Sequence, residues 1–251
     1  MISIIIPAYN EENRLPYYLD SILQYLEQKK RIYEILVVDD GSTDATAAVV
    51  KRFMALNANV KLIRLPRNRG KGFAVKTGMR QAVGRLRLFA DADGATPIEE
   101  LERLERSIEA GADVAIGSRA LLSDACSVKA RMHRKLIGAV FNTIVRTMAV
   151  RGIRDTQCGF KLFTAGAAAR IFSLQQLDGF GFDVEILCIA KRNGLYISEI
   201  PINWRDVKGG KIRLIRDSVS MLFDVIRIRI NELRNKYAIE RMGTLQGEPR
   251  K

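Results

Sequence analysis

Acidic residues directly follow two short apolar segments of this sequence. Asp39 and Asp40 come after the first of them, and Asp91 and Asp93 come after the second. Two carboxylates spaced two residues apart beyond a strand suit a hard divalent cation that also binds phosphate oxygens. Aspartates are also ordinary turn and helix-capping residues. The pair Asp91 and Asp93 therefore predicts either a metal–phosphate site or a tight turn.

A glycine-rich basic segment, Asn-Arg-Gly-Lys-Gly, occupies residues 68–72. Backbone N–H groups at the start of a helix, together with the Lys71 ammonium, suit an anion. The spacing of a Walker loop or of a dinucleotide fingerprint is absent. A P-loop nucleotidase and a nicotinamide dehydrogenase are therefore disfavoured. In the earlier acidic pair, the Asp39 carboxylate at the end of a predicted strand is suited to accept hydrogen bonds from a base or a ribose.

Alternating strand-like and helix-like segments must position these residues. Short apolar segments with turn residues at their ends are predicted as strands at 2–6, 35–38, 60–65, 86–90 and 114–116. Helix-length segments separate them, and the one at 97–110 has Thr96 as a candidate N-cap and Pro97 at its first position. This alternation predicts an α/β domain with a mostly parallel sheet, in which ligands bind at the carboxyl ends of the strands.

The second half of the chain contains longer helical patterns. We predict an amphipathic helix over 127–150, a turn and strand over 153–163, a helix near 183–193, a strand over 196–201 and a last helix over 214–237. The predicted domains are a catalytic domain over 1–212, a basic amphipathic helix over 213–238 and a flexible tail over 239–251.

Composition excludes several classes of protein. The 251 residues are 47% hydrophobic and 27% charged, which is typical of a globular chain. Three separated cysteines predict no disulfide framework, and the single histidine excludes a multi-histidine metal site. No apolar segment reaches the roughly 18 residues that a bilayer span needs. Because Met1 leads straight into a predicted strand, no signal peptide is expected.

The net charge of +13 favours anionic partners. No acidic residue lies between Asp44 and Asp91, and a second acid-free window spans 125–154. A nucleic-acid-binding protein is one alternative, and it predicts salt-sensitive DNA binding that ignores divalent metal. The aromatic residues are scattered, and the aspartate clusters would repel phosphate without a metal, so nucleic acid is not the predicted partner.

Six motifs together resemble a known family. Segments 7–11, 37–42, 68–72 and 91–93 resemble, in order and spacing, the nucleotide-sugar domain of family 2 glycosyltransferases. Segments 154–163 and 203–211 resemble the dolichyl-phosphate β-glucosyltransferases and the related dolichol-phosphate mannose synthases. The resemblance covers about residues 1–235 and implies a glycosyltransferase A-type fold.

The resemblance implies a role for each matching residue. Catalytic roles fall to Asp93 and to a basic pair on a mobile loop, Arg205 and Lys211. Asp91 and Asp93 match metal and sugar-diphosphate ligands, so Mg²⁺ or Mn²⁺ is the implied cofactor. The substrate-binding candidates are Pro7, Tyr9, Glu11, Val37 and Asp39 for the base and ribose, and Lys71, Asp91, Ala92, Arg119 and Gln157 for the rest of the donor site.

The donor follows from one difference within the family. Mannose synthases have a metal-binding glutamine where this chain has Ala95, and the segment 93–96 resembles the glucosyl branch. UDP-glucose is therefore favoured over GDP-mannose. The Gln-X-X-Arg-Trp signature of processive enzymes is absent, which favours a single sugar transfer.

The implied acceptor is a polyprenyl or dolichyl monophosphate, and the implied outcome is an inverted, β-linked sugar phosphate. A phosphate monoester carries about −1.5 to −2 charges near neutral pH and needs no strong general base. A relative that acts on a hydroxyl acceptor would need one, and Asp183 and Glu185 are candidates for that role. Helix capping or ion pairing is the alternative explanation of these two acids.

Two basic amphipathic segments raise the question of a membrane. The segments 127–150 and 214–236 both combine apolar stripes with clustered Lys and Arg. Such helices can lie among lipid headgroups, or they can pack their stripes on the sheet. We expect peripheral attachment to the cytoplasmic face of a membrane, where nucleotide sugars are found.

Overall fold

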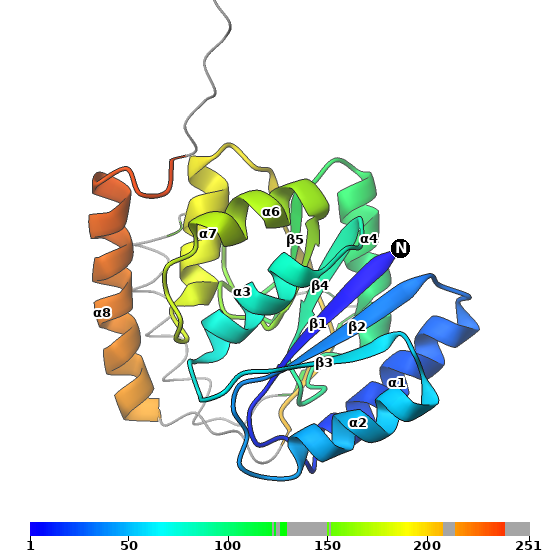
Figure 1. The fold of residues 1–251 in the computed structure, drawn as a ribbon. Coiled ribbons are helices and arrows are strands. Elements are labelled where there is room, and N and C mark those ends of the chain that lie inside the picture. The colour runs from blue at the N-terminus through cyan, green and yellow to red at the C-terminus, as the bar shows by residue number, and fades with distance from the viewer. Residues whose placement is uncertain (122, 124–125, 130–149, 151, 208–213, 239–251) are drawn as a thin grey trace, which may run out of the picture.

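A seven-stranded sheet forms the centre of the computed structural model, which describes residues 1–121, 123, 126–129, 150, 152–207 and 214–238 (Figure 1). Its order is β3-β2-β1-β4-β7-β5-β8, and a two-stranded sheet pairs β6 with β9. The strands are β1 (Ile2–Ala8), β2 (Tyr33–Asp39), β3 (Val60–Arg64), β4 (Leu86–Ala90), β5 (Val114–Ser118), β6 (Val128–Lys129), β7 (Phe160–Thr164), β8 (Ile197–Pro201) and β9 (Trp204–Arg205). In the large sheet only β7 runs antiparallel to its neighbours.

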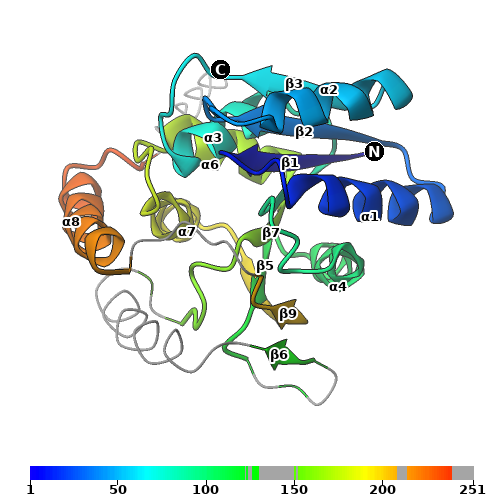
Figure 2. The same cartoon turned by 90° about the horizontal axis from the view of Figure 1, so that it is seen from below.

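Helices cover both faces of this sheet (Figure 2). They are α1 (Leu15–Gln28), α2 (Thr46–Leu56), α3 (Lys71–Gln81), η1 (Ile98–Glu100), α4 (Leu101–Glu109), α6 (Ala165–Leu174), α7 (Phe182–Arg192) and α8 (Leu214–Leu233). One core packs α3, α6 and α7 on one face, and a second core packs α1, α2 and α4 on the other. Because both faces are covered, every residue of β1 and β2 is buried and most of them are apolar, with Ser3, Glu34 and Asp39 as the polar exceptions.

The register of the strands brings their ends to one edge. β1 pairs in parallel with β2 and with β4, and Ala8 lies opposite Asp39. β7 is antiparallel to β4, so that its first residue, Phe160, lies opposite Ala90. The residues before β7 and the residues after β1, β2, β4 and β5 therefore meet at the same edge, as expected for a parallel α/β sheet.

Most of the predicted elements are present, with small shifts at their ends. β4 has the predicted bounds, and the helix that follows is α4, entered through the short turn η1. Thr96 is not its N-cap, because the backbone is still extended at Pro97 and the regular helix starts only at Leu101. The prediction missed α6 altogether; its Thr164 N-cap accepts a hydrogen bond from the Ala167 N–H.

The predicted helix over 127–150 is wrong at its start. Val128 and Lys129 form β6, which pairs in parallel with Trp204 and Arg205 of β9. Residues 130–149 lie outside the described part of the chain. The boundary between the predicted catalytic domain and the last helix, and the predicted tail over 239–251, also lie outside it, so that division stays a prediction.

α8 lies beside α7 at one side of the molecule (Figures 1 and 2). Its inner side chains Met221, Val225 and Ile228 are buried. Among the described helices, none combines the length and the apolar character that crossing a bilayer requires.

Candidate active site

Asp91 and Asp93 lie in the turn that follows β4, at the common edge of the sheet. The backbone N–H of Asp91 donates to the Gly159 carbonyl at 3.0 Å. The Asp91 carboxylate packs on Gly159 so closely that an added Cβ atom there would lie 1.9 Å from its Oδ2 atom. The glycine before β7 thus makes room for this carboxylate, a role that only the register of β7 against β4 reveals.

Lys71 neutralises Asp91 from the first residue of α3. Its Nζ atom lies 2.7 Å from Asp91 Oδ1 and 5.1 Å from the centre of the Phe89 ring. Burial alone would lower the pKa of Lys71, but the Asp91 and Asp183 carboxylates outweigh burial and raise this pKa. The side chain is therefore a fixed cation, and it brings the glycine-rich segment into contact with the aspartate pair.

Asp93 faces a cation that the sequence analysis missed. Arg14 NH1 lies 3.6 Å from Asp93 Oδ2, and the Nε and NH2 atoms of Arg14 both donate to the Glu11 carboxylate. Burial and the nearby Asp91 charge raise the pKa of Asp93. Glu11 thus aims a guanidinium at Asp93, and its position three residues before Arg14, at the entry to α1, was the available signal.

Asp39 and Asp40 have different roles although they are adjacent. Asp39 is fully buried; its Oδ1 accepts the Ser42 N–H at 2.8 Å, whereas its Oδ2 accepts no hydrogen bond from the described residues and lies 3.4 Å from Arg64 Nε. Such an acceptor suits a donor N–H or O–H of a ligand. The Asp40 carboxylate instead accepts the backbone N–H groups of Arg69 and Gly70, so it holds the glycine-rich segment.

The other residues predicted at the base and ribose lie around Asp39. Pro7 and Val37 are buried in the adjacent strands β1 and β2, and Val37 belongs to the core that packs α1, α2 and α4. Tyr9 follows β1 and is 38% exposed. Ala92 is buried between the two aspartates.

Arg119 lies at the end of β5 and is held by a carboxylate. Its Nε and NH2 atoms donate to the two oxygens of Asp155 at 2.7 and 2.8 Å, and its guanidinium lies over the Trp204 ring. Burial would raise the pKa of Asp155, but the Arg119 charge and the hydrogen bonds that Arg119 donates together outweigh burial and lower this pKa. Gln157 lies nearby and contacts Met221 of α8 through its Nε2 atom. The two predicted residues thus lie at the same edge of the sheet.

Arg205 is brought to the aspartate turn by its backbone. The Arg205 N–H donates to the Ala95 carbonyl at 2.9 Å, two residues beyond Asp93, and the Arg205 side chain is exposed. The second predicted cation of this loop, Lys211, lies outside the described residues.

The two acids at the start of α7 are buried, and both carboxylates already have partners within the protein. Asp183 forms an ion pair with the fully buried Lys161, whose Nζ also donates to the Cys158 carbonyl. Glu185 accepts hydrogen bonds from the backbone of Gln176 and Leu177. Ion pairing, one of the two alternative explanations of these acids, is present at Asp183. Glu185 instead accepts backbone hydrogen bonds from the loop after α6.

Comparison with known proteins identifies the family. The profile described as "Glycosyl transferase family 2" matches residues 3–172. The chain belongs to this family. As a family 2 glycosyltransferase, it is 40% identical over 244 residues to the dolichyl-phosphate beta-glucosyltransferase of Dictyostelium discoideum, covering 92% of this chain and 75% of the relative. It is 38% identical over 252 residues to the human protein of that name, covering 95% and 78%.

The fold of this glycosyltransferase also occurs in solved structures. Glucosyl-3-phosphoglycerate synthase from Mycobacterium tuberculosis, in complex with Mn²⁺, UDP-glucose and phosphoglyceric acid, superposes with a TM-score of 0.68. The match covers 91% of this chain and 79% of that chain at 19% identity. At this identity the match shows the fold alone, and it confirms the predicted glycosyltransferase A-type architecture.

Proposed function

We propose that this glycosyltransferase transfers glucose from UDP-glucose to a dolichyl or related polyprenyl monophosphate, with inversion at the anomeric carbon. The observation that carries the proposal is the single sheet edge that gathers Asp39, Asp91, Asp93 and Arg205. The relatives named for this reaction match more than nine-tenths of the chain, which supports the same donor and acceptor here.

The residues of the chain suit this reaction. Asp39, with a buried oxygen that accepts no hydrogen bond from the described residues, binds the base or ribose, and Tyr9 covers them. Lys71 and Arg205 neutralise the diphosphate that leaves, and Lys211 is predicted to join them. Because the acceptor phosphate is already an anionic nucleophile, the site needs alignment and charge neutralisation rather than a base.

The aspartate pair fits a divalent cation that is completed by the donor. Asp91 and Asp93 offer hard carboxylate oxygens, which Mg²⁺ and Mn²⁺ prefer, and such ions are often held by one or two carboxylates plus substrate phosphates. Within the described residues, no group of three or more acidic, cysteine or histidine side chains is placed to hold a metal by itself. The ion, when bound, supplies further neutralisation of the leaving diphosphate, and the solved relative of this fold contains Mn²⁺ with UDP-glucose.

A transfer assay tests the reaction. Labelled UDP-glucose and GDP-mannose are each offered with dolichyl phosphate, in Mg²⁺, in Mn²⁺ and in EDTA. We expect an acid-labile glucolipid from UDP-glucose only, and its loss in EDTA. Lipid labelling from GDP-mannose instead would refute the donor, and hydrolysis of UDP-glucose without lipid labelling would refute the acceptor. DNA added in excess is expected not to compete.

The hydroxyl-acceptor alternative is tested at Asp183. A general base there would make Asp183→Asn inactive, whereas the ion pair with Lys161 gives this carboxylate a structural role. We expect Asp183→Asn to retain more than about a tenth of the transfer rate per folded molecule, while its stability falls by about 3 kcal/mol because Lys161 is left buried and unpaired. Urea unfolding gives the stability, and a complete loss of transfer in folded protein would favour the alternative.

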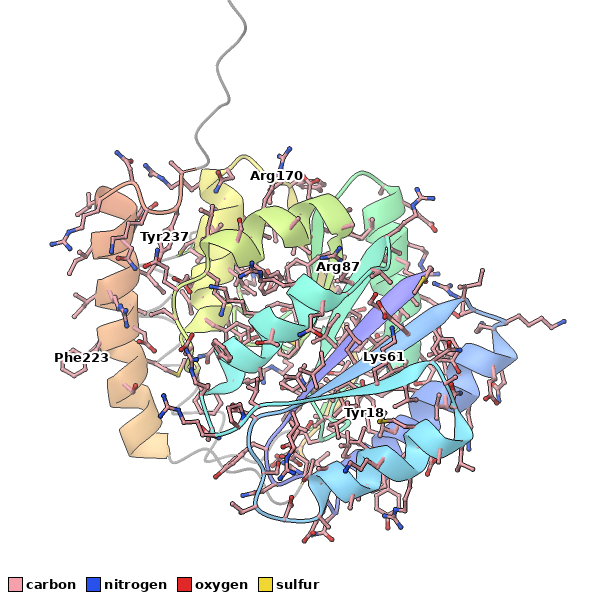
Figure 3. All side chains as sticks on the ribbon, in the orientation of Figure 1. Tyr18, Lys61, Arg87, Arg170, Phe223 and Tyr237 are labelled. Atoms are coloured by element: carbon pink, nitrogen blue, oxygen red, sulfur yellow. The ribbon has the colours of Figure 1, made fainter. Side chains whose placement is uncertain are left out.

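We further propose that the outer face of α8 contacts the lipid surface that carries the acceptor. Among the side chains of this helix that the structure describes, from residue 220 onwards, five large apolar ones are exposed, and Phe223 points away from the molecule (Figure 3). They are Leu222, Phe223, Ile226, Ile230 and Leu233. Exposed cations flank them, namely Arg227, Arg229, Arg234 and Lys236. An apolar row beside cations is complementary to an anionic bilayer.

Vesicle flotation tests this surface. The protein is expected to float with vesicles that contain phosphatidylserine, and the double variant Phe223→Ser, Ile230→Ser should float at least about fivefold less. Ile32→Ser is the matched control, since Ile32 is apolar and 74% exposed elsewhere on the molecule. Equal flotation of both variants would contradict the proposal. Attachment to the cytoplasmic face is part of the same proposal, and protease protection of sealed membranes tests it.

A further inference from the structure

Glu185 is fully buried, and the described hydrogen-bond partners of its carboxylate all come from outside α7. Its carboxylate accepts the Gln176 N–H at 3.0 Å, the Leu177 N–H at 2.8 Å and the Tyr237 O–H at 2.7 Å. Burial raises the pKa of this carboxyl group. One side chain of α7 therefore joins the loop after α6 to the segment after α8.

The loop after α6 in turn lies on the turn that presents Lys71. The Phe73 N–H donates to the Asp178 carbonyl at 3.1 Å, and Gln175 Nε2 donates to the Gly72 carbonyl at 2.9 Å. A Cβ atom added to Gly70 would lie 2.4 Å from the Asp178 carbonyl oxygen, so the two backbones are in direct contact. A movement of this loop would therefore move the first turn of α3.

Tyr237 is held from two more sides. Its hydroxyl accepts a hydrogen bond from Asn231 Nδ2 at 3.1 Å, and its carbonyl accepts one from Asn193 Nδ2 at 2.8 Å. The ring is fully buried and lies between the end of α8 and α7 (Figure 3). The end of α8 is thus fastened to the same carboxylate that holds the loop.

We infer that Glu185 is a positioning residue. It couples the packing of the segment after α8 to the position of Lys71, and the loop 175–179 connects the two. The role rests on the proposed function, because there Lys71 contacts the donor diphosphate. Glu185 therefore affects the binding of the donor although it does not contact the donor. It also means that any ligand or surface that shifts the end of α8 changes the affinity for the sugar nucleotide.

The test compares two conservative variants with a matched control. Tyr237→Phe removes only the hydroxyl group, and Glu185→Gln removes one acceptor for the loop. Asn193→Ala is the control, because it loosens the same C-terminal segment without removing a partner of Glu185. Hydrogen exchange of the peptide 69–77 is measured by mass spectrometry without any ligand, and UDP binding is measured by calorimetry with Mn²⁺.

We expect Tyr237→Phe and Glu185→Gln to speed exchange in the peptide 69–77 about fivefold to tenfold and to weaken UDP binding by a similar factor, whereas Asn193→Ala changes neither. If all three variants lower the melting temperature while exchange in this peptide stays unchanged, Glu185 has only a structural role and the inference is overturned. The exchange experiment needs no substrate, so it separates failure of this inference from failure of the proposed reaction, which would appear only in the binding experiment.

Discussion

Replacing Asp93 by asparagine is expected to reduce glucose transfer by about 10³-fold, because the variant keeps the shape of the turn and loses the charge that the diphosphate site requires. An asparagine oxygen can still accept the Ala95 N–H, which Asp93 Oδ1 accepts at 3.0 Å. Steady-state transfer to dolichyl phosphate with saturating Mn²⁺ measures the loss. Asp20→Asn, an exposed acid of α1, is the control and should remain fully active.

The same variant is expected to be as stable as the parent protein or more stable. Burial and the Asp91 charge raise the pKa of Asp93, so the folded state disfavours its ionised form. A carboxyl group with a raised pKa stabilises the fold when protonated and lowers stability as pH rises through the folded pKa. At neutral pH without metal, removing this charge should therefore leave the melting temperature unchanged or higher. An inactive variant that melts much earlier would contradict this interpretation.

Replacing Gly159 by alanine is expected to reduce transfer by about 10²-fold or more, because a 1 Å displacement of a site residue is enough for such a loss. The new methyl group would lie 1.9 Å from Asp91 Oδ2 and 2.2 Å from Asp91 Cγ, so this carboxylate must move. Transfer assays measure the loss, and binding of UDP-glucose with Mn²⁺ should weaken with it.

Gly166→Ala is the matched control for this substitution. Nothing lies within 4 Å of a Cβ atom added to Gly166, which is in the first turn of α6. Alanine is a better helix former than glycine, so this variant should be fully active and as stable as the parent protein or slightly more stable. If Gly159→Ala transfers glucose at the parent rate, transfer does not require the position of the Asp91 carboxylate in this structure, and the prediction is contradicted.

Local patterns in the sequence were sufficient for much of the fold. β-branched apolar segments with polar ends predicted β1 to β5, and the bounds of β4 are those predicted. Acids placed directly after such segments predicted the position of the site, because parallel strands end at one edge. The start of α4 was predicted too early, because the backbone is still extended at Pro97. A helix was predicted where Val128 and Lys129 form a strand, because their pairing with β9 does not follow from helical periodicity.

The sequence by itself determined the fold class, the family and the two aspartates, because each depends on residue types at short spacing. Only the tertiary structure decided which charges meet. The contact of Gly159 with Asp91 follows from the antiparallel register of β7, and the pairing of Lys161 with Asp183 joins β7 to α7. The link from Tyr237 to Glu185 spans 52 residues. Contacts of this kind depend on how distant elements pack, and a single sequence contains no local signal for that.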